Sequence, residues 1–375
     1  SDLCRICSKK WHEEQAKLQE QAENLKWKEL KKQEQKEFES EVQAYKPILM
    51  ENITPSAQTL YIIGNGFDLM HRVPSSYYNF RDSLGKHNRL REDLEIALTS
   101  EDIWADFENA LGTLNLELMG GRDIIDMWLD NFGFYDDEDG GAAEFYMAVE
   151  AAAAPISNLV SNLQPTFRRW IEHLELGTDE RPLTGLIDPQ GKVLDFNYTE
   201  FVETLYGIKN VCYIHGSRKR KGKLILGHKP GSAEDLYEWD RKPQTYRQPV
   251  IDVARDNVLD LVGQYDEDLT KDSQGIIKKH QGFFDSLGCV EHIVVIGHSI
   301  SPVDWDYFAE VKKKAEKAHW FFGIYGLNDL RNMTKLVKKL KIKNYNVFRT
   351  DGIWTKPREV NNESPSPRKD VKPDR

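Results

Sequence analysis

Between residues 56 and 355, apolar residues gather in short, nearly unbroken runs instead of alternating with polar ones. These runs are Leu60–Ile63, Val193–Phe196, Val211–Ile214, Leu224–Leu226, Ile293–Ile296, Trp320–Tyr325 and Val347–Phe348. Runs of this kind are typical of strands that are covered by helices on both faces of a sheet. The pattern therefore predicts an α/β fold with a mostly parallel sheet.

Helical periodicity separates several of these runs, notably over residues 88–119, 142–174, 305–318 and 329–341. The stretch of about 88–175 is almost wholly helical in character and interrupts the succession of strands. We expect it to form a helical subdomain inserted into the sheet domain. The acidic segment 135–141 is interpreted as a solvated connection, because its four carboxylates cannot all point inward from one short loop.

The two ends of the chain differ from the domain between them. Residues 8–46 are rich in Lys, Glu and Gln, with neither Gly nor Pro before Pro47, so they predict one long, mostly solvated helix. Its apolar spacing is too irregular for a coiled coil. The expected organisation is a helical arm (1–55), a nucleotide-binding domain (56–355) and a disordered tail (356–375). The arm is the expected contact for a homo-oligomer or another protein partner.

Composition narrows the possible partners. The formal net charge of −10 disfavours a duplex-DNA binder, which needs clustered Lys and Arg. No apolar run approaches the ~18–20 residues that span a bilayer. The four cysteines are too few for a disulfide framework, and they favour the cytoplasm. Cys4 and Cys7, with His12 nearby, are either free thiols or half of a metal site, and no metal is assigned.

Polar and glycine residues follow the apolar runs at their carboxyl ends, where open parallel sheets bind ligands. In the order of the chain these groups are Gly64-Asn65-Gly66 with Asp68, Asn197-Tyr198-Thr199, His215-Gly216-Ser217, Gly227-His228, and Gly297-His298-Ser299 with Asp304. Glycine lets a ligand approach the backbone, and the other side chains can form hydrogen bonds or transfer protons. Together they have the composition of a binding site.

Each group taken alone also has a structural explanation. Gly64-Asn65-Gly66 can be a plain turn, and His215 can be a packed histidine. Ser299 or Asp304 can cap the helix near residue 305. The basic segment 218–223 reads first as a solvated hairpin tip and second as a phosphate site.

Six segments in order, YIIGNGFDLMHRVPSSYYNF, WADFENAL, DFNYTE, YIHGS, LILGH and VIGHSISPVDWDYF, resemble the bacteriophage abortive-infection AbiH family. The resemblance covers about residues 59–330. One departure is Arg72-Val73, where the family usually has Gly-Leu. The arm and the tail lie outside the resemblance.

AbiH-like domains are distantly similar to the sirtuin-like NAD-binding fold, which implies a Rossmann-type sheet. The first glycine turn then corresponds to the sirtuin Gly-Ala-Gly turn, and Asn197 to the asparagine of the sirtuin Gln-Asn-x-Asp segment. His215-Gly216 corresponds to the catalytic His-Gly, and Gly297-His298-Ser299 to the turn that holds a nucleotide ribose. Thr199 replaces a sirtuin aspartate, and the sirtuin zinc module is missing, so deacylation of a peptide is not expected.

The resemblance implies a phage-defence effector that binds NAD and hydrolyses its nicotinamide–ribose bond. Asn197 and His215 would be the catalytic residues. NAD would contact Gly64, Asn65, Gly66, Asp68, Gly216, Gly297, His298 and Ser299. One alternative is a non-catalytic module that senses a nucleotide within a defence complex. Another is a nuclease using Asp106 and Glu108, although no acid cluster with a lysine has nuclease-like spacing in the sequence.

Overall fold

The computed structural model describes residues 25–119, 141–229 and 248–353, except 27 and 116, together with the single positions 124 and 127. The predicted tail and the Cys4 and Cys7 pair lie outside these ranges. After an N-terminal helix over residues 28–43, the elements are η1 (Met50–Asn52), β1 (Thr59–Ile63), α2 (Asn65–Met70), α3 (Tyr77–Leu84), α4 (Arg89–Ala97), α5 (Phe107–Leu111), η2 (Glu117–Met119), α7 (Gly141–Glu172), β2 (Lys192–Asp195), α8 (Phe201–Tyr206), β3 (Asn210–Tyr213), α9 (Gln248–Asp268), α10 (Ser273–Lys279), α11 (Gln281–Asp285), η3 (Ser286–Cys289), β4 (His292–Ile296), η4 (Pro302–Asp304), α12 (Trp305–Lys314), β5 (His319–Ile324), α13 (Leu327–Leu340) and β6 (Tyr345–Arg349).

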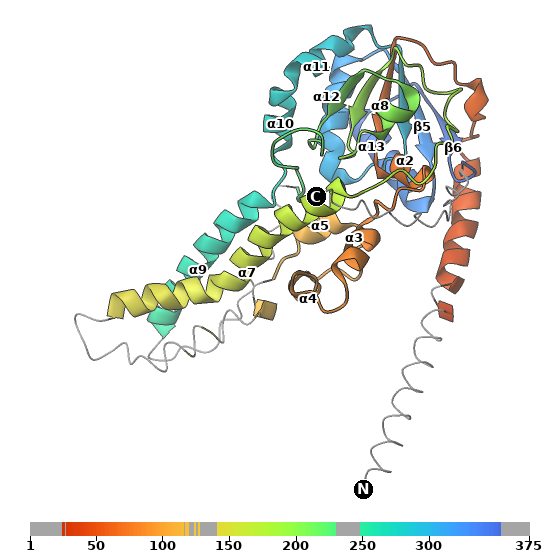
Figure 1. Cartoon of the computed structure of the whole chain (residues 1–375). Coiled ribbons are helices and arrows are strands. Elements are labelled where there is room, and N and C mark those ends of the chain that lie inside the picture. Colours follow the sequence, from red (N-terminus) through yellow and green to blue (C-terminus); the bar gives the residue numbers. More distant parts are fainter. Residues whose placement is uncertain are drawn as a thin grey trace, which may run out of the picture.

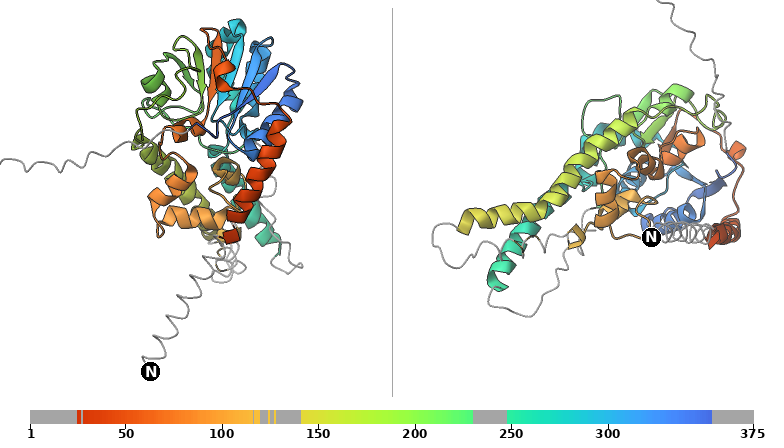
Figure 2. Two further views of the ribbon diagram at one scale, coloured as in Figure 1. Left: turned by 90° about the vertical axis from the view of Figure 1, so that its right-hand side faces the viewer. Right: turned by 60° about the horizontal axis from the view of Figure 1, so that its bottom comes forward.

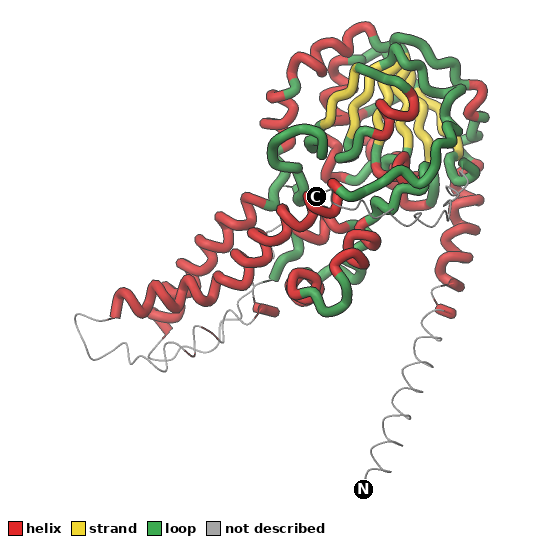
Figure 3. The backbone as a smooth tube through the Cα atoms, viewed as in Figure 1, coloured by secondary structure: helices red, strands yellow, loops and turns green. Residues whose placement is uncertain are grey.

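The six strands form one sheet in the order β3-β2-β1-β4-β5-β6, and every neighbouring pair is parallel. Figure 3 shows this sheet in yellow, surrounded by helices. The order is that of a Rossmann fold, in which the chain winds outward in both directions from the centre. The predicted α/β class and the parallel sheet are confirmed.

Both faces of the sheet are buried, as the unbroken apolar runs predicted. In β1, Tyr61 and Ile63 point into a core shared with α8 and the helical insertion, whereas Leu60 and Ile62 point into a core shared with α10–α13. All four side chains are fully buried. A strand in this position needs apolar residues at successive positions, since no face meets water.

One predicted strand is absent from the sheet. Residues 224–226 are extended, and Leu224 and Leu226 are buried, but they are not assigned to a strand. The Ile225 N–H donates to the His215 carbonyl, and His228 pairs with Thr270 in an isolated bridge. The apolar run therefore reflects burial against the helical insertion, and Gly227-His228 does not lie at a strand end.

The helical insertion is larger and more broken than predicted. The helix expected over 88–119 ends at Ala97 and restarts at Phe107, with an isolated bridge between Leu98 and Leu114 in the region between. The long helix α7 lies beside α9, which comes from a later part of the chain that the sequence did not assign to the insertion. Figures 1 and 2 show α7 and α9 extending side by side from the sheet domain. None of the described helices is long and apolar enough to cross a bilayer.

The C-terminal part of the arm packs on the sheet domain. Phe38 and Val42 belong to the core beside α13. Arg349 donates two hydrogen bonds of 2.7 Å to Glu39, and the Ile48 N–H donates to the Val347 carbonyl at the edge of the sheet. Residues 37–48 therefore form part of the folded unit, whereas Leu30 is 53% exposed.

This packing predicts different effects for two truncations along the same helix. Phe38→Ala should lower the free energy of unfolding by about 3–5 kcal/mol, because it leaves a cavity in the core. Leu30→Ala should change it by about 0.5 kcal/mol or less, since that side chain is exposed. Denaturant unfolding of both variants measures the difference. Equal, small effects would show that the whole arm is separable from the fold.

Candidate functional site

The strand order brings three loops together at the carboxyl edge of the sheet. The chain leaves β1 for β2 on one side and β4 lies on the other, so β1 and β4 mark the point where the winding reverses. Ligands of doubly wound sheets bind at this point. Asp68, Asn197 and His298, which follow β1, β2 and β4, are buried, and the helical insertion lies beside this edge (Figure 1).

The glycines at this edge pack against one another. A Cβ on Gly64 would lie 2.8 Å from the Gly297 oxygen, and a Cβ on Gly66 would lie 2.7 Å from the Gly297 Cα. Gly297 has φ +61°, and a Cβ there would lie 2.2 Å from the Phe67 nitrogen. The close approach that these glycines permit is therefore between two backbone segments, and it does not by itself indicate a ligand.

Asp68, Asn197 and Thr199 form a buried carboxyl–amide cluster. The Thr199 hydroxyl donates to Asp68 Oδ2 at 2.6 Å. Asn197 Nδ2 donates to the Gly64 carbonyl at 3.2 Å and lies 3.4 Å from Asp68 Oδ1. Burial raises the pKa of Asp68 to about 7, and the bond from Thr199 opposes this rise. The group can therefore exchange a proton near neutral pH.

A second cluster contains a buried lysine between two carboxylates. Lys271 is 1% exposed, and its Nζ lies 2.8 Å from Glu108 Oε2 and 3.4 Å from Asp304 Oδ1. These residues come from the insertion, from the connection between α9 and α10, and from the loop after β4. Burial raises the pKa of Glu108 despite the neighbouring ammonium, whereas both carboxylates raise the pKa of Lys271 above its ordinary value. Lys271 is therefore charged.

Two histidines complete this ionic cluster, which we define as Glu108, His215, Lys271, His298 and Asp304. The Nε2 atoms of His215 and His298 each lie 3.6 Å from a different oxygen of Asp304. The edges of both imidazoles meet the ring of Phe196, with centroid distances of 5.2 and 4.4 Å. Because Phe196 precedes Asn197, the ionic cluster adjoins the carboxyl–amide cluster.

Both histidines are neutral at physiological pH. Burial, the Lys271 ammonium and His298 hold the pKa of His215 well below its usual range. Burial lowers the pKa of His298 to about 4, against the opposing effect of Asp304. The Nε2 of His215 is buried and has no hydrogen-bond partner among the described residues. The same holds for the hydroxyl of Tyr307, whose ring centroid lies 5.8 Å from that of His215. A neutral imidazole of this kind can accept a proton from a bound molecule.

The sequence model of the family described as bacteriophage abortive infection AbiH matches residues 60–324. This range includes the whole sheet up to the end of β5, the helical insertion and both clusters. The chain belongs to the AbiH family. Membership of this family supports a role in bacteriophage abortive infection. The searches found no match among curated proteins or solved structures.

The other residues proposed from the sequence of this AbiH protein lie outside the two clusters. Asn65 is exposed and bonds to Ser75, donating to its carbonyl at 3.0 Å and accepting from its hydroxyl at 2.6 Å. Gly216 has φ +87°, which permits the turn after His215. Ser299 is exposed, and its carbonyl accepts a bond from Asn332.

The sequence did not identify Lys271, and it placed Asp304 either among the strand-end groups of the site or at the cap of the following helix. Asp304 occupies the N-cap position of α12 but makes no capping hydrogen bond, because its carboxylate faces Lys271 and the histidines. The sequence also showed no acid cluster with a lysine, whereas the fold assembles one from residues 108, 271 and 304. Within the described ranges, no group of three His, Cys, Asp or Glu side chains is placed to hold a metal ion.

Removing the charge of Lys271 should expose its importance for stability. Lys271→Met should lower the free energy of unfolding by about 3–5 kcal/mol, because two buried carboxylates lose their cation. Adding Glu108→Gln should recover part of this loss. Lys313→Met removes an exposed lysine that pairs with Glu310, and it should lower the free energy of unfolding by about 1 kcal/mol or less. Chemical denaturation measures all three, and a Lys271 effect as small as the Lys313 effect would contradict the description of the cluster.

Asp68 should make stability fall as pH rises. The folded protein keeps the proton on Asp68 up to about pH 7, whereas the unfolded chain releases it near pH ~4. The loss of stability caused by ionising the buried Asp68 is therefore absent in acid and complete above pH ~7. From about pH 5 to 8, the wild type should lose roughly 2–3 kcal/mol more stability than Asp68→Asn. Parallel pH profiles of the two proteins would show that Asp68 is ionised throughout.

Proposed function

We propose that this AbiH protein is a phage-defence effector that binds NAD at the carboxyl edge of its sheet and hydrolyses the nicotinamide–ribose bond. The observation that carries the proposal is the neutral His215, whose buried Nε2 has no hydrogen-bond partner and adjoins a buried cluster of proton-exchanging groups. Histidines packed only for structure usually have both ring nitrogens satisfied.

The residues at this edge have hydrogen-bonding groups of the kinds that bind a dinucleotide. Asp68 and Asn197 offer an acceptor and a donor for ribose hydroxyls, and Ser299 is an exposed hydroxyl after β4. The glycines Gly64, Gly66 and Gly297 support the proposal less, since they already pack on each other.

The same groups suit cleavage of a glycosidic bond to a charged leaving group. When the C–N bond breaks, its electrons pass to the nicotinamide nitrogen, and positive charge develops on the ribose. The Asp304 carboxylate, in a site from which water is excluded, would stabilise this charge. A water molecule would then bond to the ribose carbon and give its proton to His215, while Asn197 holds the ribose in position. The products are nicotinamide and ADP-ribose.

The covered state of the site also bears on regulation. Asp68, Asn197, His215, His298 and Asp304 are 6% exposed or less. A nucleotide can reach them only if the insertion and the strand-end loops separate. In the proposed function, this closed form limits NAD consumption in the cytoplasm, and a trigger during infection opens it. The exposed Leu25 and Leu30 of the arm offer a contact for a second copy or a defence partner.

His215→Ala and Asn197→Ala should each lower NAD cleavage by roughly 10²–10⁴-fold, the usual contribution of positioned proton transfer. The double variant should cleave NAD only slightly more slowly than the slower single variant, since the two groups act on one step. His319→Ala is the control, because this histidine lies at the amino end of β5 and bonds to Asn346. Free nicotinamide and the melting temperature are measured on the same preparations.

The outcomes separate the candidate functions. A folded and fully active His215→Ala protein would contradict the mechanism. NAD binding without release of nicotinamide in the wild type would favour a sensing module. Metal-dependent cutting of RNA or plasmid with NAD left intact would favour a nuclease.

A further inference from the structure

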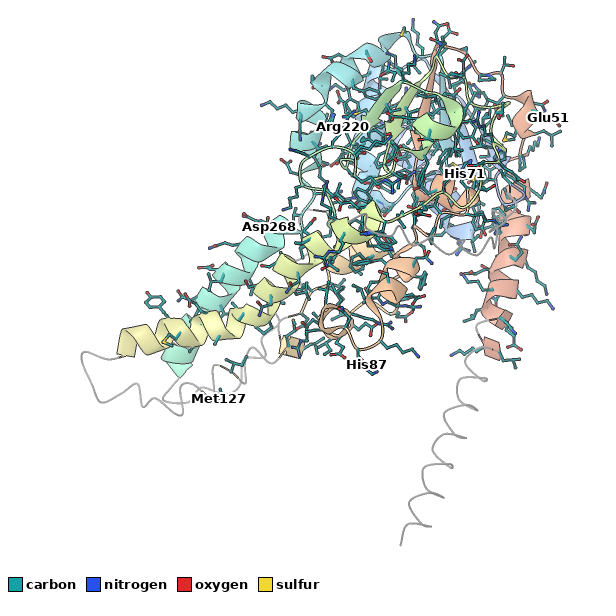
Figure 4. The ribbon with its side chains drawn as sticks, in the orientation of Figure 1. Glu51, His71, His87, Met127, Arg220 and Asp268 are labelled. Atoms are coloured by element: carbon teal, nitrogen blue, oxygen red, sulfur yellow. The ribbon has the colours of Figure 1, made fainter. Side chains whose placement is uncertain are left out.

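A cavity lies at the outer edge of β3, beside the turn that follows His215. It has a volume of about 380 Å³, near the lower end of the range for small-molecule sites. Four cationic side chains line it, three from the basic loop (residues 218–223) and one from the end of α10; they are Arg220, Lys221, Lys223 and Lys279. Figure 4 labels Arg220 on the side of the sheet domain that faces α10.

The charge around this cavity is unbalanced. None of the described residues that line it is acidic. Lys223 pairs with Asp268 at 2.9 Å, but no salt bridge of the described residues includes Arg220, Lys221 or Lys279. These cations are exposed, so water and salt screen their mutual repulsion, but together they give the mouth of the cavity a positive potential that attracts an anion.

The fold holds the basic loop in place. Arg168, on α7, donates to the Gly222 carbonyl at 2.7 Å and to the Arg220 carbonyl at 3.2 Å. Arg218 turns away from the cavity and forms a two-bond pair with Glu200. Arg218 is thus a structural residue, whereas Arg220, Lys221 and Lys223 line the cavity. A loop fixed in this way presents its charges without a large ordering cost.

The remaining lining suits the organic part of a small ligand. Ile214, Ile225 and the ring of Tyr213 contribute apolar surface, and Arg220 lies over the Tyr213 ring with 5.4 Å to its centroid. His280 also lines the cavity, and its Nδ1 lies 3.3 Å from Cys212 Sγ. Burial, and then the charges of Lys279 and Arg220, lower the pKa of His280.

We propose that this cavity binds the phosphate group of a small phosphorylated molecule, with Arg220, Lys221 and Lys279 as the cations that hold it. A polynucleotide is disfavoured because these charges surround one cavity and do not extend as a stripe over an acidic protein. The cavity adjoins the proposed NAD site, because its lining includes Gly216 and Ser217, which follow His215. None of its cations belongs to the two buried clusters.

Calorimetric titration of the full chain tests the proposal with pyrophosphate, inorganic phosphate and AMP as probes. Arg220→Gln/Lys279→Gln should weaken pyrophosphate binding at least tenfold, which is about 1.4 kcal/mol. Lys279→Gln alone should weaken it less, and it removes only an exposed side chain, so folding is retained. Lys278→Gln is the matched control, because this exposed neighbour does not line the cavity. It should leave the affinity unchanged.

The three probes also distinguish the source of the phosphate. Tighter binding of AMP than of inorganic phosphate would support an organic phosphate, since the apolar lining then contributes. Equal binding of AMP and inorganic phosphate would overturn the organic part of the proposal. Bound phosphate should also raise the pKa of His280 in an NMR titration, because it offsets the charges of Lys279 and Arg220.

Two results would overturn the proposal. One is the same pyrophosphate affinity in the double variant and in Lys278→Gln. The other is binding of a single-stranded oligonucleotide with no binding of the small phosphates. NAD cleavage measured in these variants should equal that of the wild type, so failure of this site and failure of the proposed function give different results.

Discussion

The buried ammonium of Lys271 is the interaction on which the arrangement of this AbiH protein depends. It lies between Glu108 of the helical insertion and Asp304 of the loop after β4. A buried charge is strongly destabilising unless it is paired, so the three segments must meet at one place. The pairing holds the insertion beside the carboxyl edge of the sheet, where the chain winding reverses and Rossmann folds bind ligands.

Closure of this edge sets the chemistry of the residues beneath it. Exclusion of water keeps His215 neutral and raises the pKa of Asp68 to about 7. A base and an acid with altered pKa values in one buried region are typical of a functional site. In the proposed function, the same burial requires the edge to open before a nucleotide can enter, so the interactions that stabilise the closed edge oppose access to the site.

The sequence predicted the sheet because strands covered on both faces must be apolar at successive positions, as in Leu60–Ile63. It also predicted polar groups at the strand ends, since parallel strands share one edge. It could not predict Lys271 or α9, because their positions follow from packing between segments far apart in the chain. Leu224–Leu226 was interpreted as a strand because burial against helices leaves the same apolar pattern.

A crystal structure of His215→Ala with NAD tests the central claim most directly. The account predicts that the nicotinamide ribose lies beside Asn197 and Asp68, with the insertion displaced from the carboxyl edge. NAD bound elsewhere, or absent while Lys271 still pairs with Glu108 and Asp304, would contradict it.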